Sequence, residues 1–303
     1  MKRDFLSLRD LSRDELSQVL EQAQAFKQGR LKPSLAGKAV VLVFEKASTR
    51  TRISFEVGID RLGGHPIVLT PGSSQMGRGE PLKDTARILS RYAEMIVMRT
   101  YAHATIEEVA QWADVPVINA LTDLLHPCQV LSDCFTLSEI FGELTDKKIA
   151  WIGDGNNMAN SWINAAALFG FELTLACPAG YEPDQGILSA AFIDGAAVRV
   201  VREPAEAVKG AVAVNTDVWA SMGQEQEARA RRQAFQGYQV DARLMSQAAP
   251  EAVFLHCLPA HRGEEVTEEV LESAQSVVWD QAENRLYVQE AIMDFLVGHH
   301  HER

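Results

Sequence analysis

The chain has 303 residues, of which 47% are hydrophobic and 23% charged, and this composition excludes an intrinsically disordered protein. Its 29 basic against 41 acidic residues give a net charge of −12, which disfavours nucleic acid and anionic membranes as partners. An anionic ligand must therefore be held by local groups of arginine. The length exceeds that of a single hydrophobic core, so two domains are expected.

The cysteines and the N-terminal residues indicate a cytoplasmic protein. The four cysteines show no CxxC spacing, so we expect reduced thiols rather than disulfides. The first residues run into polar sequence without the apolar segment of a signal peptide, and no apolar run approaches the roughly 20 residues of a membrane span.

The first half alternates helical patterns with short apolar runs. Ser12 and Glu15 form a capping box that predicts the first helix, and Thr105 with Glu108 predicts another capped helix start. A long helical pattern covers residues 126–142, and the polar stretch after it marks a domain boundary. Strands are predicted at residues 40–44, 66–69, 95–98 and 115–118.

The second half repeats this alternation. Strands are predicted at residues 149–152, 172–175, 197–201, 212–214, 253–255 and 277–279. Continuous apolar runs suit parallel strands that helices cover on both faces. We therefore predict an α/β protein with two doubly wound domains and an active site in the cleft between them. Residues 1–142 would form the first domain, with the last helix (284–303) packing back on it, and residues 148–283 the second.

The turn after the first predicted strand combines hydroxyl and guanidinium groups at the start of a helix. Ser48-Thr49-Arg50-Thr51-Arg52 supplies helix N-terminal N–H groups, side-chain donors and positive charge at one point. A capped helix with solvated arginines is the alternative interpretation. The position at a strand's carboxyl end, in an acidic protein, favours an anion site.

Other strand ends supply residues that suit the same site. Arg99 directly follows one strand, and His126 and Gln129 begin the long helix after another. Gln75 and Arg78 lie in a loop rich in Gly and Ser. Together these side chains describe a pocket for a phosphate and a small carbonyl group, in which the arginines neutralise the phosphate.

The second half carries two further motifs after strands. Asp217 and Ser221-Met222-Gly223 offer a carboxylate, a hydroxyl and a glycine hinge that could grip an amino acid. Gly153-Asp154-Gly155-Asn156-Asn157-Met158 has Met158 where a dinucleotide fingerprint needs glycine, so a nicotinamide cofactor is not expected.

A third motif contains candidate metal ligands. His256-Cys257-Leu258-Pro259-Ala260-His261 suggests zinc, but adjacent residues should point to opposite sides of the chain, so we predict no metal. Arg285 is one more cation near a predicted strand end.

In combination these motifs resemble the aspartate/ornithine carbamoyltransferase family over essentially the whole chain. Ser48-Thr49-Arg50-Thr51-Arg52, Arg99 and His126-Pro127-Cys128-Gln129 are similar to its carbamoyl-phosphate signature. Asp217-x-x-x-Ser221-Met222-Gly223 and His256-Cys257-Leu258-Pro259 resemble the ornithine branch. The aspartate branch would carry a basic residue in the loop rich in Gly and Ser, and Pro-Leu-Pro in place of Cys257-Leu258-Pro259.

The resemblance implies a role for each matching residue. Carbamoyl phosphate would be bound by Ser48, Thr49, Arg50, Thr51, Arg99, His126, Gln129, Cys257, Leu258 and Arg285. Ornithine would be bound by Asn157, Asp217, Ser221 and Met222. Gln75 would reach a neighbouring subunit's site in a homotrimer. No metal or organic cofactor is implied.

The implied reaction transfers the carbamoyl group to the δ-amine of ornithine, giving citrulline and phosphate in arginine metabolism. Asp217 and Cys257 would orient the amine, while Arg50, Arg99 and His126 would stabilise the developing charge. Two alternatives stay open: a carbamoyltransferase for putrescine or an acylated ornithine, and an inactive regulatory relative.

Overall fold

A computed structural model describes residues 2–70, 79–220 and 227–301 of the chain. The chain forms two compact units, one of residues 1–132 and 283–303 and the other of residues 133–282. Each unit is built around one parallel sheet, as the continuous apolar runs predict. Among the described residues, no helix has the length and apolar character needed to cross a membrane.

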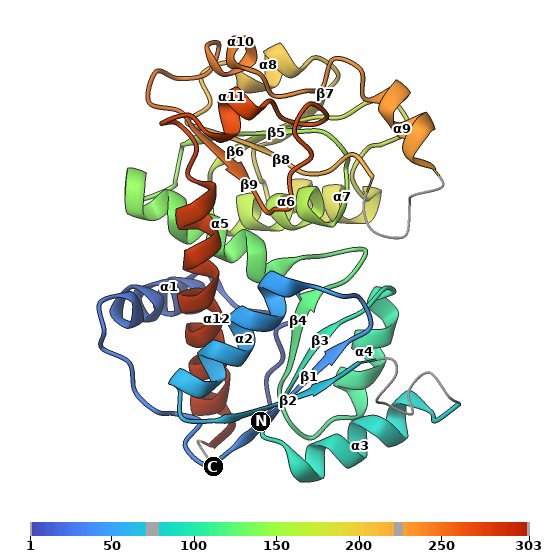
Figure 1. Cartoon of the computed structure of the whole chain (residues 1–303), viewed down its shortest axis with the longest axis vertical. Helices are drawn as coiled ribbons and strands as arrows, with labels where there is room; N and C mark the ends of the chain where they lie inside the picture. Colours follow the sequence, from blue (N-terminus) through green and yellow to red (C-terminus); the bar gives the residue numbers. More distant parts are fainter. Residues whose placement is uncertain (1, 71–78, 221–226, 302–303) are drawn as a thin grey trace. The chain divides into compact units, whose positions relative to one another are not determined.

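The first unit contains a four-stranded parallel sheet in the order β2-β1-β3-β4 (Figure 1). Its strands are β1 (Ala39–Phe44), β2 (His65–Leu69), β3 (Met95–Arg99) and β4 (Val117–Leu121). Its helical elements are η1 (Leu8–Asp10), α1 (Arg13–Lys27), α2 (Thr49–Arg61), α3 (Leu82–Tyr92) and α4 (His103–Trp112).

The strand order determines which face each helix covers. The chain moves in one direction from β1 to β2 and in the other through β3 and β4, so right-handed crossovers place α2 opposite α3 and α4. A cluster of buried hydrophobic residues supports this placement of the helices, because Val41 and Val43 of β1 pack in it together with Ala86 of α3 and Ile106 of α4. The other face of β1 carries Val40, Leu42 and Phe44.

The second unit contains a five-stranded parallel sheet in the order β7-β6-β5-β8-β9. Its strands are β5 (Lys148–Ile152), β6 (Glu172–Ala176), β7 (Val198–Val201), β8 (Ala213–Thr216) and β9 (Val253–His256). Its helices are α6 (Asn157–Phe169), α7 (Gln185–Ile193), α8 (Pro204–Val208), α9 (Ala228–Ala234), α10 (Ala242–Met245) and α11 (Glu268–Leu271). Helices α5 (Pro127–Phe141) and α12 (Val278–His301) contain the boundaries between the units.

Two of the predicted elements are wrong. Residues 277–279 are not a strand, because α12 already begins at Val278 and only Ser276 forms an isolated bridge, to Phe254. Thr105 does not cap α4, which begins two residues earlier at His103, where the ring Nδ1 lies 2.9 Å from Thr122 Oγ1. The capping box of Ser12 and Glu15 is confirmed at the start of α1.

In each sheet one pair of neighbouring strands leads to crossovers on opposite faces. This pair is β1 and β3 in the first unit, and β5 and β8 in the second. At such a point the two connections diverge and leave a crevice outside the carboxyl ends of the strands. The residues that follow these strands are therefore the first candidates for ligand binding.

Candidate active site

The turn after β1 forms the N-terminus of α2, as the sequence predicts. Ser48 is the N-cap residue, and its side chain accepts a hydrogen bond from the Thr51 N–H at 3.2 Å. Arg52 is half exposed and pairs with Glu56 one turn along the helix, at 2.8 Å, so it points away from this turn. Arg50 is partly buried and, within the described part of the chain, has no ion pair. Of the two arginines, Arg50 is therefore the candidate for binding an anion at this turn.

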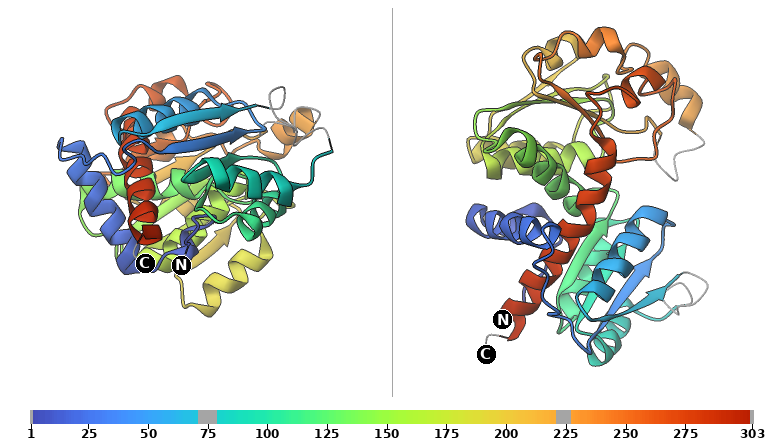
Figure 2. Two further views of the ribbon diagram at one scale, coloured as in Figure 1. Left: turned by 90° about the horizontal axis from the view of Figure 1, so that it is seen from below. Right: turned by 60° about the vertical axis from the view of Figure 1, so that its left-hand side comes forward.

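Helix α12 brings Arg285 to the same turn from the far end of the sequence. The Arg285 side chain is buried, and its Nη2 donates to Thr51 Oγ1 at 2.7 Å. Gly58 of α2 permits this packing, because a Cβ there would lie 3.1 Å from Glu290 Cγ of α12. Figure 2 shows α12 running alongside α2 in this unit. The sequence alone indicates only a cation near a strand end, not this partner.

His126 and Gln129 lie buried at the start of α5, and Arg99 ends β3. Burial, together with the positive charges of Arg285 and Arg99, holds the pKa of His126 well below its usual value. The imidazole is therefore neutral near pH 7 and can donate a hydrogen bond without adding charge. The register between β3 and β4 shifts at Arg99, an irregularity of the kind that redirects a side chain.

Lys46 is a further cation at this edge, and we did not single it out from the sequence. It is buried, and its Nζ lies 4.2 Å from the centre of the Tyr101 ring. Burial lowers the pKa of Lys46, the nearby Asp123 opposes this shift, and Arg99 adds to it. The interaction with Arg99 places Lys46 beside the predicted anion site. Its position two residues after the end of β1 and two residues before Ser48 was the available signal.

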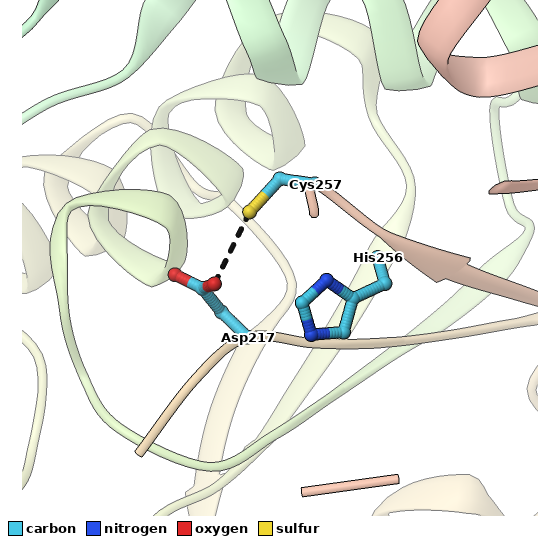
Figure 3. Close-up of side chains that lie close together, drawn as sticks. All are labelled: Asp217, His256 and Cys257. Carbon is cyan, nitrogen blue, oxygen red and sulfur yellow. Dashed lines mark hydrogen bonds between the residues drawn. The ribbon is translucent and has the colours of Figure 1, made fainter. Parts of the chain in front are cut away.

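In the second unit, Asp217 follows β8 and three groups hold its carboxylate. Oδ1 accepts from the Val218 N–H at 2.8 Å and from the Cys257 thiol, with Sγ at 3.1 Å (Figure 3). Oδ2 accepts from Asn156 Nδ2 at 2.9 Å. Asp217 and Cys257, predicted from separate motifs, are thus direct neighbours. Asn156 was not predicted to contribute.

His256 supports the turn that carries Cys257. Its Nδ1 accepts from the Leu258 N–H at 2.9 Å, so the ring proton lies on Nε2 and faces Glu265 Oε1 at 3.1 Å. Leu258 has a positive φ of 57°, an uncommon conformation for a residue with a side chain, and its N–H points back to the ring.

The sequence argument that kept His256 and Cys257 apart is wrong, because the strand ends at His256 and the chain turns there. Ligand atoms of Asp217, His256 and Cys257 lie within 4.8 Å of one another and could surround a metal ion. Both His256 nitrogens, however, already face partners. Metal binding by this ring would require one of those contacts to break.

The glycine motif after β5 is explained by packing. A Cβ on Gly155 would lie 2.2 Å from the backbone of Glu182 and Pro183, so only glycine fits there.

Asp154 forms a buried ion pair with Arg231 of α9, at 2.8 Å. Burial raises the pKa of Asp154 to about 6 against the opposing charge of Arg231. Arg231 also donates to the Trp219 carbonyl at 2.9 Å, which ties α9 to the segment after Asp217.

The structure gathers the predicted residues into two groups, one in each unit. Asn157 is partly buried in the first turn of α6, next to Asn156, and Leu258 follows Cys257. Thr49 is exposed at the first position of α2. Five residues of the predicted loops lie outside the described residues, namely Gln75, Arg78, Ser221, Met222 and Gly223.

Comparisons with known proteins match both units. Residues 3–139 match the carbamoyl-P binding domain of aspartate/ornithine carbamoyltransferase, and residues 145–296 match its Asp/Orn binding domain. The curated ornithine carbamoyltransferase of Nitratidesulfovibrio vulgaris (strain DP4) is 54% identical over 297 residues, which cover 98% of this chain and 99% of the relative.

Solved structures agree with this match. Ornithine carbamoyltransferase from Pyrococcus furiosus is 46% identical with a TM-score of 0.94, over 98% of this chain and 97% of that chain. A variant of N-acetyl-L-ornithine transcarbamylase in complex with PALAO is 34% identical with a TM-score of 0.88, over 97% and 99% of the two chains. The resemblance seen in the sequence motifs is confirmed: the chain belongs to the aspartate/ornithine carbamoyltransferase family.

Proposed function

We propose that this protein transfers the carbamoyl group of carbamoyl phosphate to the δ-amine of L-ornithine, giving L-citrulline and phosphate. The observation that carries the choice of acceptor is the Asp217 carboxylate, which is held in place beside the Cys257 thiol. A fixed negative charge attracts the cationic ammonium groups of ornithine and repels the extra carboxylate of aspartate.

The first unit would hold carbamoyl phosphate at the N-terminus of α2. Backbone N–H groups there, the Ser48, Thr49 and Thr51 hydroxyls and the guanidinium groups of Arg50, Arg99 and Arg285 suit a phosphate. The neutral imidazole of His126 and the amide of Gln129 would contact the carbamoyl carbonyl or its amide. In a protein with a net charge of −12, such a concentration of cations favours an anionic ligand.

The second unit would hold ornithine at the carboxyl ends of β5 and β8. We assign this role to Asn157, Asp217, Ser221 and Met222, together with the turn at Cys257 and Leu258, which would contribute to both substrates. No metal ion or organic cofactor takes part in the proposed reaction.

The chemical step follows from these charges. The ornithine amine loses a proton and attacks the carbamoyl carbon, the bond from that carbon to the bridging oxygen breaks, and phosphate leaves and can take up the proton. Asp217 and Cys257 orient the amine, and orientation alone can contribute several kcal/mol. Arg50, Arg99 and His126 stabilise the negative charge that develops on the carbonyl oxygen and the phosphate.

We further propose a cytoplasmic homotrimer that serves arginine biosynthesis, in which Gln75 reaches the site of a neighbouring subunit. The four cysteines are unpaired, which suits a reducing compartment. Ile53 and Val57 of α2 are 53% and 41% exposed one turn apart, an apolar stripe that suits self-association.

A two-substrate assay tests the activity. The purified protein should release phosphate and form citrulline only when both carbamoyl phosphate and ornithine are present. Aspartate, putrescine and N-acetylornithine serve as parallel acceptors at equal concentration. A higher kcat/KM for any of these three would overturn the choice of ornithine, and no product with any acceptor would indicate an inactive relative.

A mixing experiment tests the shared site. Gln75→Ala and Arg50→Ala subunits should each be nearly inactive alone. After the two variants are dissociated together and reassembled, hybrid trimers should recover activity, because some sites then contain both natural residues. No recovery in trimers whose mixed composition is verified by mass would place Gln75 in its own subunit's site.

A further inference from the structure

Asn156 connects the start of α6 to the carboxylate of Asp217. It is the N-cap residue of α6, and its Oδ1 accepts from the backbone N–H groups of Met158 at 3.0 Å and Ala159 at 3.3 Å. Its Nδ2 donates to Asp217 Oδ2 at 2.9 Å. One side chain therefore bonds the residues that follow β5 and β8, the two strands at the divergence point of the second sheet.

The helix determines which end of the Asn156 amide faces Asp217. Backbone N–H groups can only donate, so the amide oxygen must lie toward the helix. The NH2 group is then directed at the carboxylate. This orientation cannot reverse without breaking both cap bonds and placing the amide oxygen against a negative charge.

The contact restricts how Asp217 can receive a ligand. Oδ1 already has two donors, from Val218 and Cys257, whereas Oδ2 has Asn156 alone among the described residues. A carboxylate oxygen accepts about two hydrogen bonds, so Oδ2 retains one site. With the other three bonds made, the carboxylate is held in one rotamer, and that remaining site has a defined direction.

We propose that Asn156 is a positioning residue for ornithine. It holds Asp217 so that the remaining acceptor site of Oδ2 receives an ammonium group of the substrate, and it acts through Asp217 without touching the substrate. This inference rests on the proposed function, because the role is defined toward ornithine.

Two substitutions separate this role from helix capping. Asn156→Ser and Asn156→Asp both keep an oxygen that can cap α6, but neither keeps an N–H directed at Asp217. We expect kcat/KM for ornithine to fall by about tenfold in Asn156→Ser, as for loss of a hydrogen bond to a charged group. In Asn156→Asp we expect kcat/KM for ornithine to fall by about a hundredfold, because a second carboxylate then faces Asp217. Most of the change should appear in KM for ornithine, and KM for carbamoyl phosphate should stay within about twofold.

Asp184→Ala is the matched control. Asp184 caps α7 in the same unit by accepting from the Ile187 N–H at 3.0 Å, and its side chain has no bond to Asp217. This variant should melt at a lower temperature with unchanged ornithine kinetics. If Asn156→Ser and Asn156→Asp also keep wild-type ornithine kinetics, Asn156 is only a cap and the proposal is overturned.

A stability cycle tests the contact independently of activity. Asn156→Asp should lower Tm in the wild-type background but not in Asp217→Asn, where the facing charge is absent. Additive effects would show that the two side chains do not interact, and would overturn the proposal. This cycle needs no substrate, so its result is independent of the acceptor assay. If the wild-type protein does not carbamoylate ornithine in that assay, the proposed function itself is refuted.

Discussion

Glu290→Gln should make the protein more stable at neutral and alkaline pH. Glu290 lies on α12, where its side chain is 0% exposed and its Oε1 is 3.2 Å from Arg61 Nε of α2. Burial raises the pKa of Glu290 from 4.5 to about 7, although the charge of Arg61 opposes the shift. The ionised form is therefore disfavoured in the folded protein.

The direction and size of the effect follow from this shift. A carboxyl group that binds its proton more tightly when folded contributes stability below pH 4.5, and this contribution is lost as the pH rises through about 7. At about 1.4 kcal/mol per pKa unit, the loss is about 3 kcal/mol. Glutamine mimics the protonated form. Above about pH 8, the free energy of unfolding of the variant should therefore be about 3 kcal/mol greater than that of the wild type, and its Tm roughly 6–12 °C higher.

Thermal unfolding of both proteins from about pH 5 to pH 8.5 measures this difference. The wild-type Tm should fall relative to the variant between about pH 5 and pH 7.5, and the difference should be smallest at the acidic end. Glu283→Gln, an exposed position on the same helix, is the matched control and should leave the pH dependence unchanged. Parallel curves for Glu290→Gln and the wild type would refute the reasoning.

Three further substitutions test the proposed site and its support. Arg50→Ala should lower kcat/KM for carbamoyl phosphate by at least about a hundredfold, whereas Arg52→Ala, which loses only an exposed ion pair, should keep kcat/KM within about twofold of the wild-type value. Similar losses for the two variants in steady-state assays would contradict the assignment. Asp217→Asn should raise KM for ornithine at least about tenfold and leave carbamoyl-phosphate binding unchanged by calorimetry, and equal losses would argue against separate binding by the two units. Arg231→Met should destabilise the protein by about 3 kcal/mol or more near pH 8, and less near pH 5, where Asp154, with its pKa of about 6, can be protonated. A loss of Tm that does not depend on pH would show that the loss does not come from an unpaired Asp154 charge.

Local sequence patterns were sufficient to predict the sheets and most of the candidate site. Nine apolar runs became parallel strands, because residues buried on both faces of a sheet form continuous hydrophobic segments. The carboxyl ends of those strands then gave the positions of Ser48, Arg99 and Asp217. The run at 277–279 was equally apolar but begins α12, since so short a segment does not separate a strand from the first turn of a buried helix.

Only the tertiary structure decided which of these residues are neighbours. The hydrogen bond from Arg285 to Thr51 joins residues 234 positions apart in the sequence, and no local sequence pattern can predict a contact over that separation. The same applies to the contacts of Asp217 with Asn156 and Cys257, which depend on the order β5-β8-β9. Residue types and spacing determined which chemical groups are available at each strand end. The order of strands in the sheets, set by packing over the whole chain, determined which of those groups act together.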